Sequence, residues 1–290
     1  MSKHEKIARL LTKPYILING VFQCTAPVPV AKSAGQGLTG FAQGFLKGWP
    51  RLYQFLVETF SPVLVSRGMK RALKSALDRH GDADTVVNLG SGPLGLPSRP
   101  DIINVDITPF GCVDICADAT NLPFSDGVVD CLINLAMLEH VPDPHAVLKE
   151  MRRVLKPGGD FLCYVPFCQP VHAAPSDYNR WTKDGAVRLF PHQDVLNTGV
   201  GSGPTSGWLW ITIEWLSLAL SFGNRHVKDL LALSFMLVLF PLKYLDLYLE
   251  NHPEACRISS AFYVEGSKVS DPQEDLGMAG VETGVSHVPD

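Results

Sequence analysis

The sequence predicts an α/β fold: a Rossmann-like, doubly wound sheet that is mostly parallel and has an antiparallel last strand. Between residues 84 and 166, short apolar β-branched runs alternate with helical segments, a pattern typical of a parallel sheet covered on both faces. The first run ends in Gly90-Ser91-Gly92 and the second in Asp106, which is the layout of a nucleotide-type site at the ends of adjacent strands. Two later runs, 195–200 and 258–264, predict further strands, the last of them antiparallel.

The N-terminal residues are expected to cover this core with loops and helices. Residues 23–50 are rich in Gly, Pro, Ala, Gln and Ser, which is typical of a loop. Residues 51–79 have helical periodicity, and Pro62 is expected to divide them into two helices. The apolar stretch 15–22 is short for a signal peptide and follows Lys13-Pro14, so secretion is not expected.

The core elements follow in order along the chain. Asp143-Pro144 predicts the N-cap and first residue of a helix that ends at 156–159. The inner face of that helix is formed by Val147, Leu148, Met151, Val154 and Leu155. A short helix is expected at 182–190. The other strands are predicted at 85–89, 102–106, 113–117, 128–135 and 160–166.

Composition narrows the classes of partner. The 290 residues carry a formal net charge of −4 and no basic stripe, so nucleic acid is not expected as a partner. The seven cysteines contain no CxxC pair and no zinc-ligand spacing. We therefore expect reduced thiols that pack in a cytoplasmic protein, and no metal site.

Six sequence blocks then occur in a fixed order between Val86 and Pro166. The order and spacing of these blocks resemble class I S-adenosylmethionine-dependent methyltransferases of the methyltransferase type 11 family. The resemblance implies S-adenosyl-L-methionine as the cofactor. The blocks are Asn88-Leu-Gly-Ser-Gly92, Asn104-Val-Asp106, Ala117-Asp-Ala-Thr-Asn-Leu-Pro-Phe124, Asp130-Cys-Leu-Ile-Asn134, Leu138-Glu-His-Val141 and Leu155-Lys-Pro-Gly-Gly159.

The resemblance also implies a role for individual residues. Asp106 is expected to hold both ribose hydroxyls, because a carboxylate can accept two hydrogen bonds at once. Asp118 would accept a hydrogen bond from the adenine amino group and the Ala119 amide would donate to the ring, unless Asp118 only shapes a turn. The implied cofactor-binding residues are Asn88, Gly90, Ser91, Gly92, Asp106, Asp118, Ala119 and Asn134.

Two positions depart from the family pattern. Asn88 stands where the family usually has an acid, so a hydrogen bond to the cofactor ammonium would lack charge assistance. The third glycine of the loop is displaced by one residue, to Gly95. We therefore expect weaker cofactor binding than the family pattern would give.

Polar residues after the fourth and fifth strands are candidates for the chemistry and the acceptor. His140 is a candidate general base, since imidazole accepts a proton near neutral pH; the alternative is that it caps or packs the next helix. The stretch 166–181 is expected to receive a polar acceptor, or else to be a structural loop. Its candidate substrate-binding residues are His172, Asp177, Tyr178, Arg180 and Trp181.

Two apolar segments, 208–222 and 230–242, flank a basic turn at 223–228. Thirteen residues of helix span about 20 Å, so a transmembrane helix is not expected. The segments could instead cover one face of the sheet, lie as a monotopic hairpin in a membrane interface, or form a homodimer interface.

With this insertion the chain divides into an N-terminal loop and helical cover (1–80), a methyltransferase core (81–200), an apolar helical hairpin (201–255), a final core strand (256–266) and a disordered tail (267–290).

These observations predict a cytoplasmic methyltransferase, peripheral at the inner membrane face if the hairpin binds lipid. It would act on an oxygen or nitrogen of a small-molecule or lipid- or glycan-linked acceptor. One alternative is a non-catalytic cofactor-binding or membrane-attached protein on the same scaffold. Another is an NAD-dependent oxidoreductase, because Gly90–Gly95 also reads as G-x-G-x-x-G.

Overall fold

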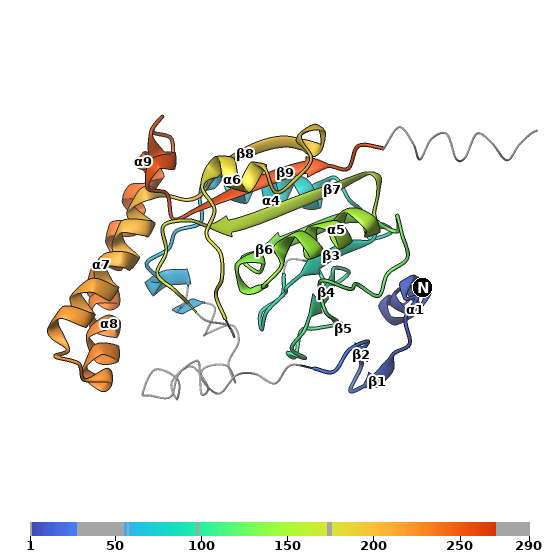
Figure 1. Ribbon diagram of the computed structural model, residues 1–290, viewed down its shortest axis with the longest axis horizontal. Coiled ribbons are helices and arrows are strands. Elements are labelled where there is room, and N and C mark those ends of the chain that lie inside the picture. Colours follow the sequence, from blue (N-terminus) through green and yellow to red (C-terminus); the bar gives the residue numbers. More distant parts are fainter. Residues whose placement is uncertain (1, 28–54, 57, 97–98, 173–175, 271–290) are drawn as a thin grey trace, which may run out of the picture.

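A central sheet has the strand order β1-β2-β5-β4-β3-β6-β7-β9-β8 (Figure 1). The computed structural model describes residues 2–27, 55–56, 58–96, 99–172 and 176–270. Within these residues, β1 and β9 run antiparallel to their neighbours and the other adjacent pairs are parallel. The predicted mostly parallel, doubly wound fold is therefore confirmed. The strands of its core are β3 (Val86–Leu89), β4 (Ile103–Asp106), β5 (Ile115–Cys116), β6 (Val129–Leu135), β7 (Leu155–Pro166), β8 (Val195–Ser202) and β9 (Ala261–Ser267).

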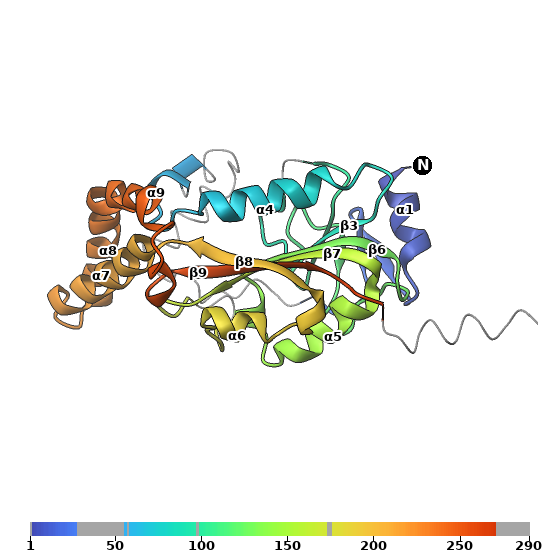
Figure 2. The ribbon, with the colours of Figure 1, turned by 90° about the horizontal axis from the view of Figure 1, so that it is seen from above.

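Helices cover both faces of this sheet, which explains the continuous apolar strands. Val87 in β3 pairs with Ile103 in β4 and with Leu132 in β6, and all three side chains are fully buried. Helix α4 (Arg67–Asp78) lies on one face, and α5 (Pro144–Val154) and α6 (Lys183–Val187) lie on the other (Figure 2). A strand buried on both faces has no polar side to alternate with its apolar one.

Helix α5 begins as predicted and ends one residue earlier than its predicted inner face. The Asp143 carboxylate accepts a hydrogen bond from the Ala146 amide at 3.1 Å, and Pro144 is the first helical residue. Leu155 is already extended and opens β7, where it pairs with Val129. Pro157 disfavours helical backbone at Lys156, so the chain leaves the helix before the glycines are reached.

The N-terminal residues add strands to the sheet, whereas only loops and helices were expected there. After α1 (Lys3–Leu10), β1 (Ile16–Ile18) and β2 (Val21–Gln23) form a hairpin, and β2 pairs with β5. The turn is Asn19-Gly20, with φ of 50° and 82°, the left-handed backbone that a two-residue hairpin turn requires. Most of the predicted loop at 23–50 lies outside the described residues.

The C-terminal strand continues further than predicted. The 3₁₀ turn Ala255–Arg257 occupies the space before it, so β9 starts at Ala261 and ends at Ser267, three residues later than expected. Lys268 then donates from its backbone to the Gly159 carbonyl at 2.9 Å. The tail was predicted to be disordered from residue 267, which is wrong for 267–270; residues 271–290 lie outside the described residues.

The two apolar segments form α7 (Pro204–Leu220) and α8 (Arg225–Leu239), an antiparallel pair that stands beyond one end of the sheet (Figures 1 and 2). They do not cover a sheet face, and α8 has no buried residue. Helical backbone continues from α8 through the 3₁₀ segment Phe240–Leu245 and α9 (Asp246–Leu249). By length and composition this 25-residue stretch is long and apolar enough to cross a membrane, whereas the prediction from the sequence counted only the 13-residue apolar run 230–242.

The base of the helical pair is nevertheless fixed inside the protein by two fully buried charged residues. Lys243 donates to the carbonyls of Glu58, Thr59 and Ser61 at 2.7–3.0 Å, and its burial lowers its pKa. Asp246 accepts hydrogen bonds from the amides of Thr205 and Ser206 at 2.7 and 2.8 Å. The Asp246 carboxylate therefore caps the N-terminus of α7 from a distant part of the chain.

Gly203, the N-cap of α7, makes room for this cap. A Cβ atom at Gly203 would lie 2.4 Å from Cγ of Asp246. Because Gly203 has no side chain to cap the helix itself, Asp246 supplies the acceptors instead. The position of the helical pair thus depends on one carboxylate.

We predict that Asp246→Ala destabilises the protein by about 3 kcal/mol. The Thr205 amide, the Ser206 amide and the Ser206 hydroxyl are buried donors, and all three would lose a charged acceptor. Asp246→Asn keeps one acceptor oxygen, so it should lower the free energy of unfolding by about half as much. Chemical denaturation followed by tryptophan fluorescence measures the change, since Trp208, Trp210 and Trp215 lie on α7. An unchanged midpoint in Asp246→Ala would contradict this account of the cap.

Candidate functional site

The candidate site begins where β3 ends in the glycine turn. Gly90, Gly92 and Gly95 all have positive φ, of 72°, 60° and 59°. A Cβ atom at Gly90 would lie 2.4 Å from Cγ of Met137, so only glycine fits beneath that side chain. The displaced glycine, Gly95, also has left-handed backbone, and a Cβ atom there would lie 3.2 Å from Oδ1 of Asn104.

Asp106 closes the turn from the end of β4. Its carboxylate accepts hydrogen bonds from the backbone amides of Gly92 and Thr108, each at 2.9 Å. Each oxygen retains a second lone pair, because one amide occupies only one acceptor direction. The side chain is thus held in place and can still accept hydroxyl donors.

Two buried polar atoms near this turn have no hydrogen-bond partner among the described residues: Ser91 Oγ and Asn134 Oδ1. Asn134, at the end of β6, is fully buried and uses its amide nitrogen to bind the Leu89 carbonyl at 3.0 Å. A buried acceptor without a donor is costly unless a ligand supplies one. Both atoms therefore fit a polar ligand bound against the turn, and S-adenosylmethionine offers such donors.

Asn88 has a structural partner. Its amide nitrogen donates to Asn104 Oδ1 at 2.9 Å, and both side chains are buried between β3 and β4. The Asn88 amide nitrogen is therefore used within the fold, where it links β3 to β4. A contact between Asn88 and the cofactor stays a prediction.

Asp118 shapes the turn after β5. Its Oδ1 accepts from the Thr120 amide and from the Thr120 hydroxyl, both at 2.8 Å. This is the turn role that the sequence left open, and it uses one of the two carboxylate oxygens. Ala119 packs against the main hydrophobic core. The adenine contacts of both residues stay predictions.

A second cluster, Glu139, His140 and His172, forms where the chain continues beyond β6. Glu139 Oε1 lies 3.8 Å from His140 Nε2 and 3.6 Å from His172 Nε2. Glu139 is fully buried, and neither of its carboxylate oxygens has a hydrogen-bond partner among the described residues. The sequence places Glu139 beside His140 in the Leu138–Val141 block but gives it no role, and only folding brings His172 to the other two.

The stretch 176–181 supports this cluster from one side. Asp177 binds the Arg180 guanidinium, which lowers the pKa of Asp177 to about 2, and it accepts from the His172 amide at 2.8 Å. Burial by itself lowers the pKa of His172, but Glu139, the Pro170 carbonyl and Asp177 outweigh it, so that pKa is raised. Tyr178 is exposed, and Trp181 packs on the core. Of the predicted acceptor residues, the structure therefore joins His172, Asp177 and Arg180.

The apolar helices reach this cluster. The His172 ring lies 5.4 Å from the Trp210 ring of α7 and 5.3 Å from the His140 ring, measured between centroids. Strand β8 ends at Ser202 beside Ala261 of β9, so α7 starts at the same sheet edge at which β7 ends. The helical pair and the polar cluster thus share one edge.

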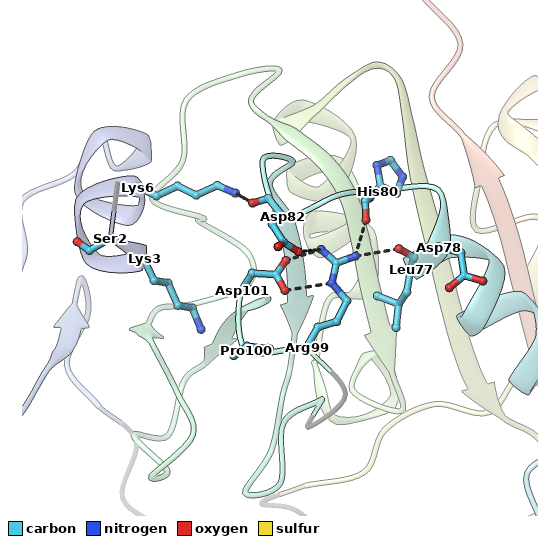
Figure 3. A pocket seen from close by; sticks show the side chains of 10 residues that line it. All are labelled: Ser2, Lys3, Lys6, Leu77, Asp78, His80, Asp82, Arg99, Pro100 and Asp101. Atoms are coloured by element: carbon cyan, nitrogen blue, oxygen red, sulfur yellow. Dashed lines mark hydrogen bonds and ion pairs between the residues drawn. The ribbon is translucent and has the colours of Figure 1, made fainter.

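A cavity of about 530 Å³ lies at the opposite edge, before β3 and β4 (Figure 3). Its central side chain, Arg99, donates to Asp101 at 3.0 Å and to the carbonyls of Leu77 and His80 at 2.8 and 2.5 Å. The bond from Arg99 holds the pKa of Asp101 below its usual range. Because the guanidinium is already paired and ligands of this fold bind at the carboxyl ends of the strands, this cavity is not the candidate site.

Comparison with known proteins agrees with the sequence blocks. Residues 101–163 match the family model of a methyltransferase domain of the type 11 family. The chain is 32% identical over 115 residues to the ubiquinone/menaquinone biosynthesis C-methyltransferase UbiE of Caulobacter sp., which covers 39% of this chain and 43% of that protein. It is 29% identical over 185 residues to a probable tRNA methyltransferase 9B of Homo sapiens, covering 62% of this chain and 32% of the relative. The chain thus spans less than half the length of these relatives.

Solved structures align with this chain at low sequence identity and with TM-scores below 0.5. A Haloferax volcanii putative methyltransferase, in complex with the Trm112 methyltransferase activator, aligns over 79% of this chain and 98% of its own, with a TM-score of 0.45 and 17% identity. Geranyl diphosphate C-methyltransferase from Streptomyces coelicolor aligns over 93% and 94%, with a TM-score of 0.42 and 14% identity. The resemblance that the sequence blocks predict is confirmed over residues 101–163, which match a methyltransferase domain.

Proposed function

We propose that this protein transfers a methyl group from S-adenosylmethionine to an oxygen or nitrogen of a small, lipid-linked acceptor. The observation that carries the proposal is the meeting of two sets of residues at one edge of the sheet. The glycine turn with Asp106 and the unpartnered Ser91 and Asn134 suits the cofactor. The Glu139, His140 and His172 cluster, which begins four residues after β6, suits the acceptor.

The chain's own residues would bind and orient both reactants. Asp106 would accept from the ribose hydroxyls, and the peptide groups of the glycine turn would approach the rest of the cofactor closely. S-adenosylmethionine supplies a methyl group on a positively charged sulfur, which an acceptor attacks in line. Positioning provides much of the rate of such a displacement, and His140 Nε2 is available to accept a proton from the acceptor.

Exposed apolar side chains on α7, on α8 and in the turn between them favour an acceptor embedded in or anchored to a membrane. Trp215 and Phe222 are 64% and 92% exposed, and Leu230 and Val238 are 57% and 72% exposed. The one acid of α7, Glu214, is paired with Lys228 of α8 at 2.8 Å. A surface this apolar is typical of helices that lie in a membrane interface.

A cationic surface adjoins these helices. Arg67, Lys70, Arg71 and Lys74 line one side of α4 together with Asn251, which follows α9. Arg67 donates to the Leu247 carbonyl of α9, where Tyr248 is 79% exposed. Arg67 and Lys74 are already paired with the carboxylates of Glu250 and Asp78. Lys70 and Arg71 are therefore the charges that anionic lipid headgroups would complement while the apolar helices enter the interface. This arrangement suits a protein attached to the inner face of a cytoplasmic membrane.

Calorimetry with S-adenosylmethionine, S-adenosylhomocysteine and NAD tests the cofactor. We expect both adenosyl ligands to bind and NAD not to bind. Asp106→Asn should weaken S-adenosylhomocysteine binding by about tenfold or more, since one charged acceptor is lost. Asp126→Asn is the matched control, because that carboxylate is exposed and lies before β6 at the other sheet edge. Binding of NAD alone would overturn the proposal.

Flotation with vesicles containing anionic lipid tests the membrane contact. The double variant Trp215→Ser/Phe222→Ser should lower the partition coefficient by about tenfold, because two large apolar side chains no longer enter the interface. Leu196→Ser is the control, an equally exposed apolar residue on β8. Failure of the wild-type protein to float, with a dimer seen by light scattering, would show that the helices bind a second copy instead.

A further inference from the structure

We propose that Glu139, His140 and His172 bind a divalent transition-metal ion, best suited to Zn²⁺, that receives the acceptor's oxygen. This inference rests on the proposed function, since it assigns the acceptor side of the same site. The sequence shows no zinc-ligand spacing at this site, because α5 and β7 separate His172 from the other two ligands.

The distances between the three groups suit a shared ion. One ligand atom from each residue lies within 4.8 Å of the other two. Glu139 Oε1 is 3.6 Å from one histidine Nε2 and 3.8 Å from the other. Ligands about 2.1 Å from a tetrahedral zinc are about 3.4 Å apart, so small side-chain rotations would close the site.

The buried Glu139 carboxylate is a second reason, besides the distances, to place a cation at this site. It is fully buried, and neither oxygen has a hydrogen-bond partner among the described residues. Keeping such a buried carboxylate ionised costs several kcal/mol unless a cation lies close to it. An ion between the two histidine rings would meet that requirement.

Both histidines are oriented as metal ligands are. His140 Nδ1 lies 2.6 Å from the Ser176 carbonyl, and His172 Nδ1 lies 3.1 Å from the Pro170 carbonyl. A carbonyl oxygen needs a donor, so each Nδ1 carries the hydrogen and each Nε2 presents its lone pair to Glu139. Arg180 also lies 3.3 Å from His172 Nδ1, but it already donates to Asp177 and to the Pro170 carbonyl. Backbone carbonyls commonly fix ligating histidines in this way.

The donor set selects the class of metal. Two imidazole nitrogens and one carboxylate suit Zn²⁺ and its neighbours in the first transition row, whereas Mg²⁺ and Ca²⁺ prefer oxygen ligands. Three protein ligands leave a coordination position open, and the His172 side chain is 28% exposed. An acceptor hydroxyl can therefore reach the ion.

The ion would act by making the acceptor a better nucleophile. Binding to Zn²⁺ lowers the pKa of a hydroxyl. Because the ion then occupies His140 Nε2, the ion replaces His140 as the group that activates the acceptor, and the proton leaves to solvent. The bound oxygen forms a bond to the methyl carbon while the bond from that carbon to sulfur breaks. The products are a methyl ether and S-adenosylhomocysteine, so atoms and charge balance without a further reactant.

Titration of the metal-free protein with ZnCl₂ by calorimetry, and with CoCl₂ by visible absorption, tests the site. We expect one ion per chain and the intense absorption of low-coordinate Co²⁺. Glu139→Gln and His172→Ala should each weaken Zn²⁺ binding by at least about tenfold. His145→Ala is the control, an exposed histidine on α5. The His172 variant keeps the test valid if the Glu139 variant fails to fold.

Two results would overturn the inference. One is no stoichiometric binding of Zn²⁺ by the wild-type protein, in which case a proton on His172 is the cation beside Glu139. The other is an affinity unchanged in both ligand variants. S-adenosylhomocysteine binding to the same samples is measured separately, so loss of the metal site with intact cofactor binding leaves the proposed function standing.

Discussion

The parallel register of β4, β3, β6 and β7 is the constraint on which the rest of the structure depends. Strands that run in one direction bring their carboxyl ends to one edge, so every turn that follows a strand adds a side chain to the same surface. Asp106 at the end of β4 meets Asn134 and Glu139, which lie at and just after the end of β6, for this reason. A one-residue slip in β6 would turn Asn134 away from the Leu89 carbonyl.

The apolar helices are attached to this edge by buried charge. Asp246 and Lys243 are both fully buried and each satisfies several backbone groups, so the base of the helical pair is fixed while α8 remains without a buried residue. The two ends of the helical pair therefore differ in their surroundings. The base belongs to the folded core, and apolar side chains beyond it, such as Trp215 and Val238, are exposed.

The sequence predicted those parts of the fold that depend on local chemistry. The glycine turn, the Asp143-Pro144 helix start and the β-branched runs of β3 and β6 each carry their own signal. The N-terminal hairpin was missed, although Asn19-Gly20 is a strong turn signal, because the flanking runs are only three residues long. The Asp246 cap and the Glu139–His172 contact could not be predicted, since each joins residues that are distant in sequence and have no paired motif.

The most direct test of the account is a crystal structure with S-adenosylhomocysteine. The ribose hydroxyls should lie within hydrogen-bond distance of the Asp106 carboxylate. The cofactor sulfur should face the cluster of Glu139, His140 and His172, because the methyl group must pass from one set of residues to the other. A ligand bound in the cavity beside Arg99, or one whose sulfur points away from Glu139, would contradict the claim that cofactor and acceptor meet at this edge of the sheet.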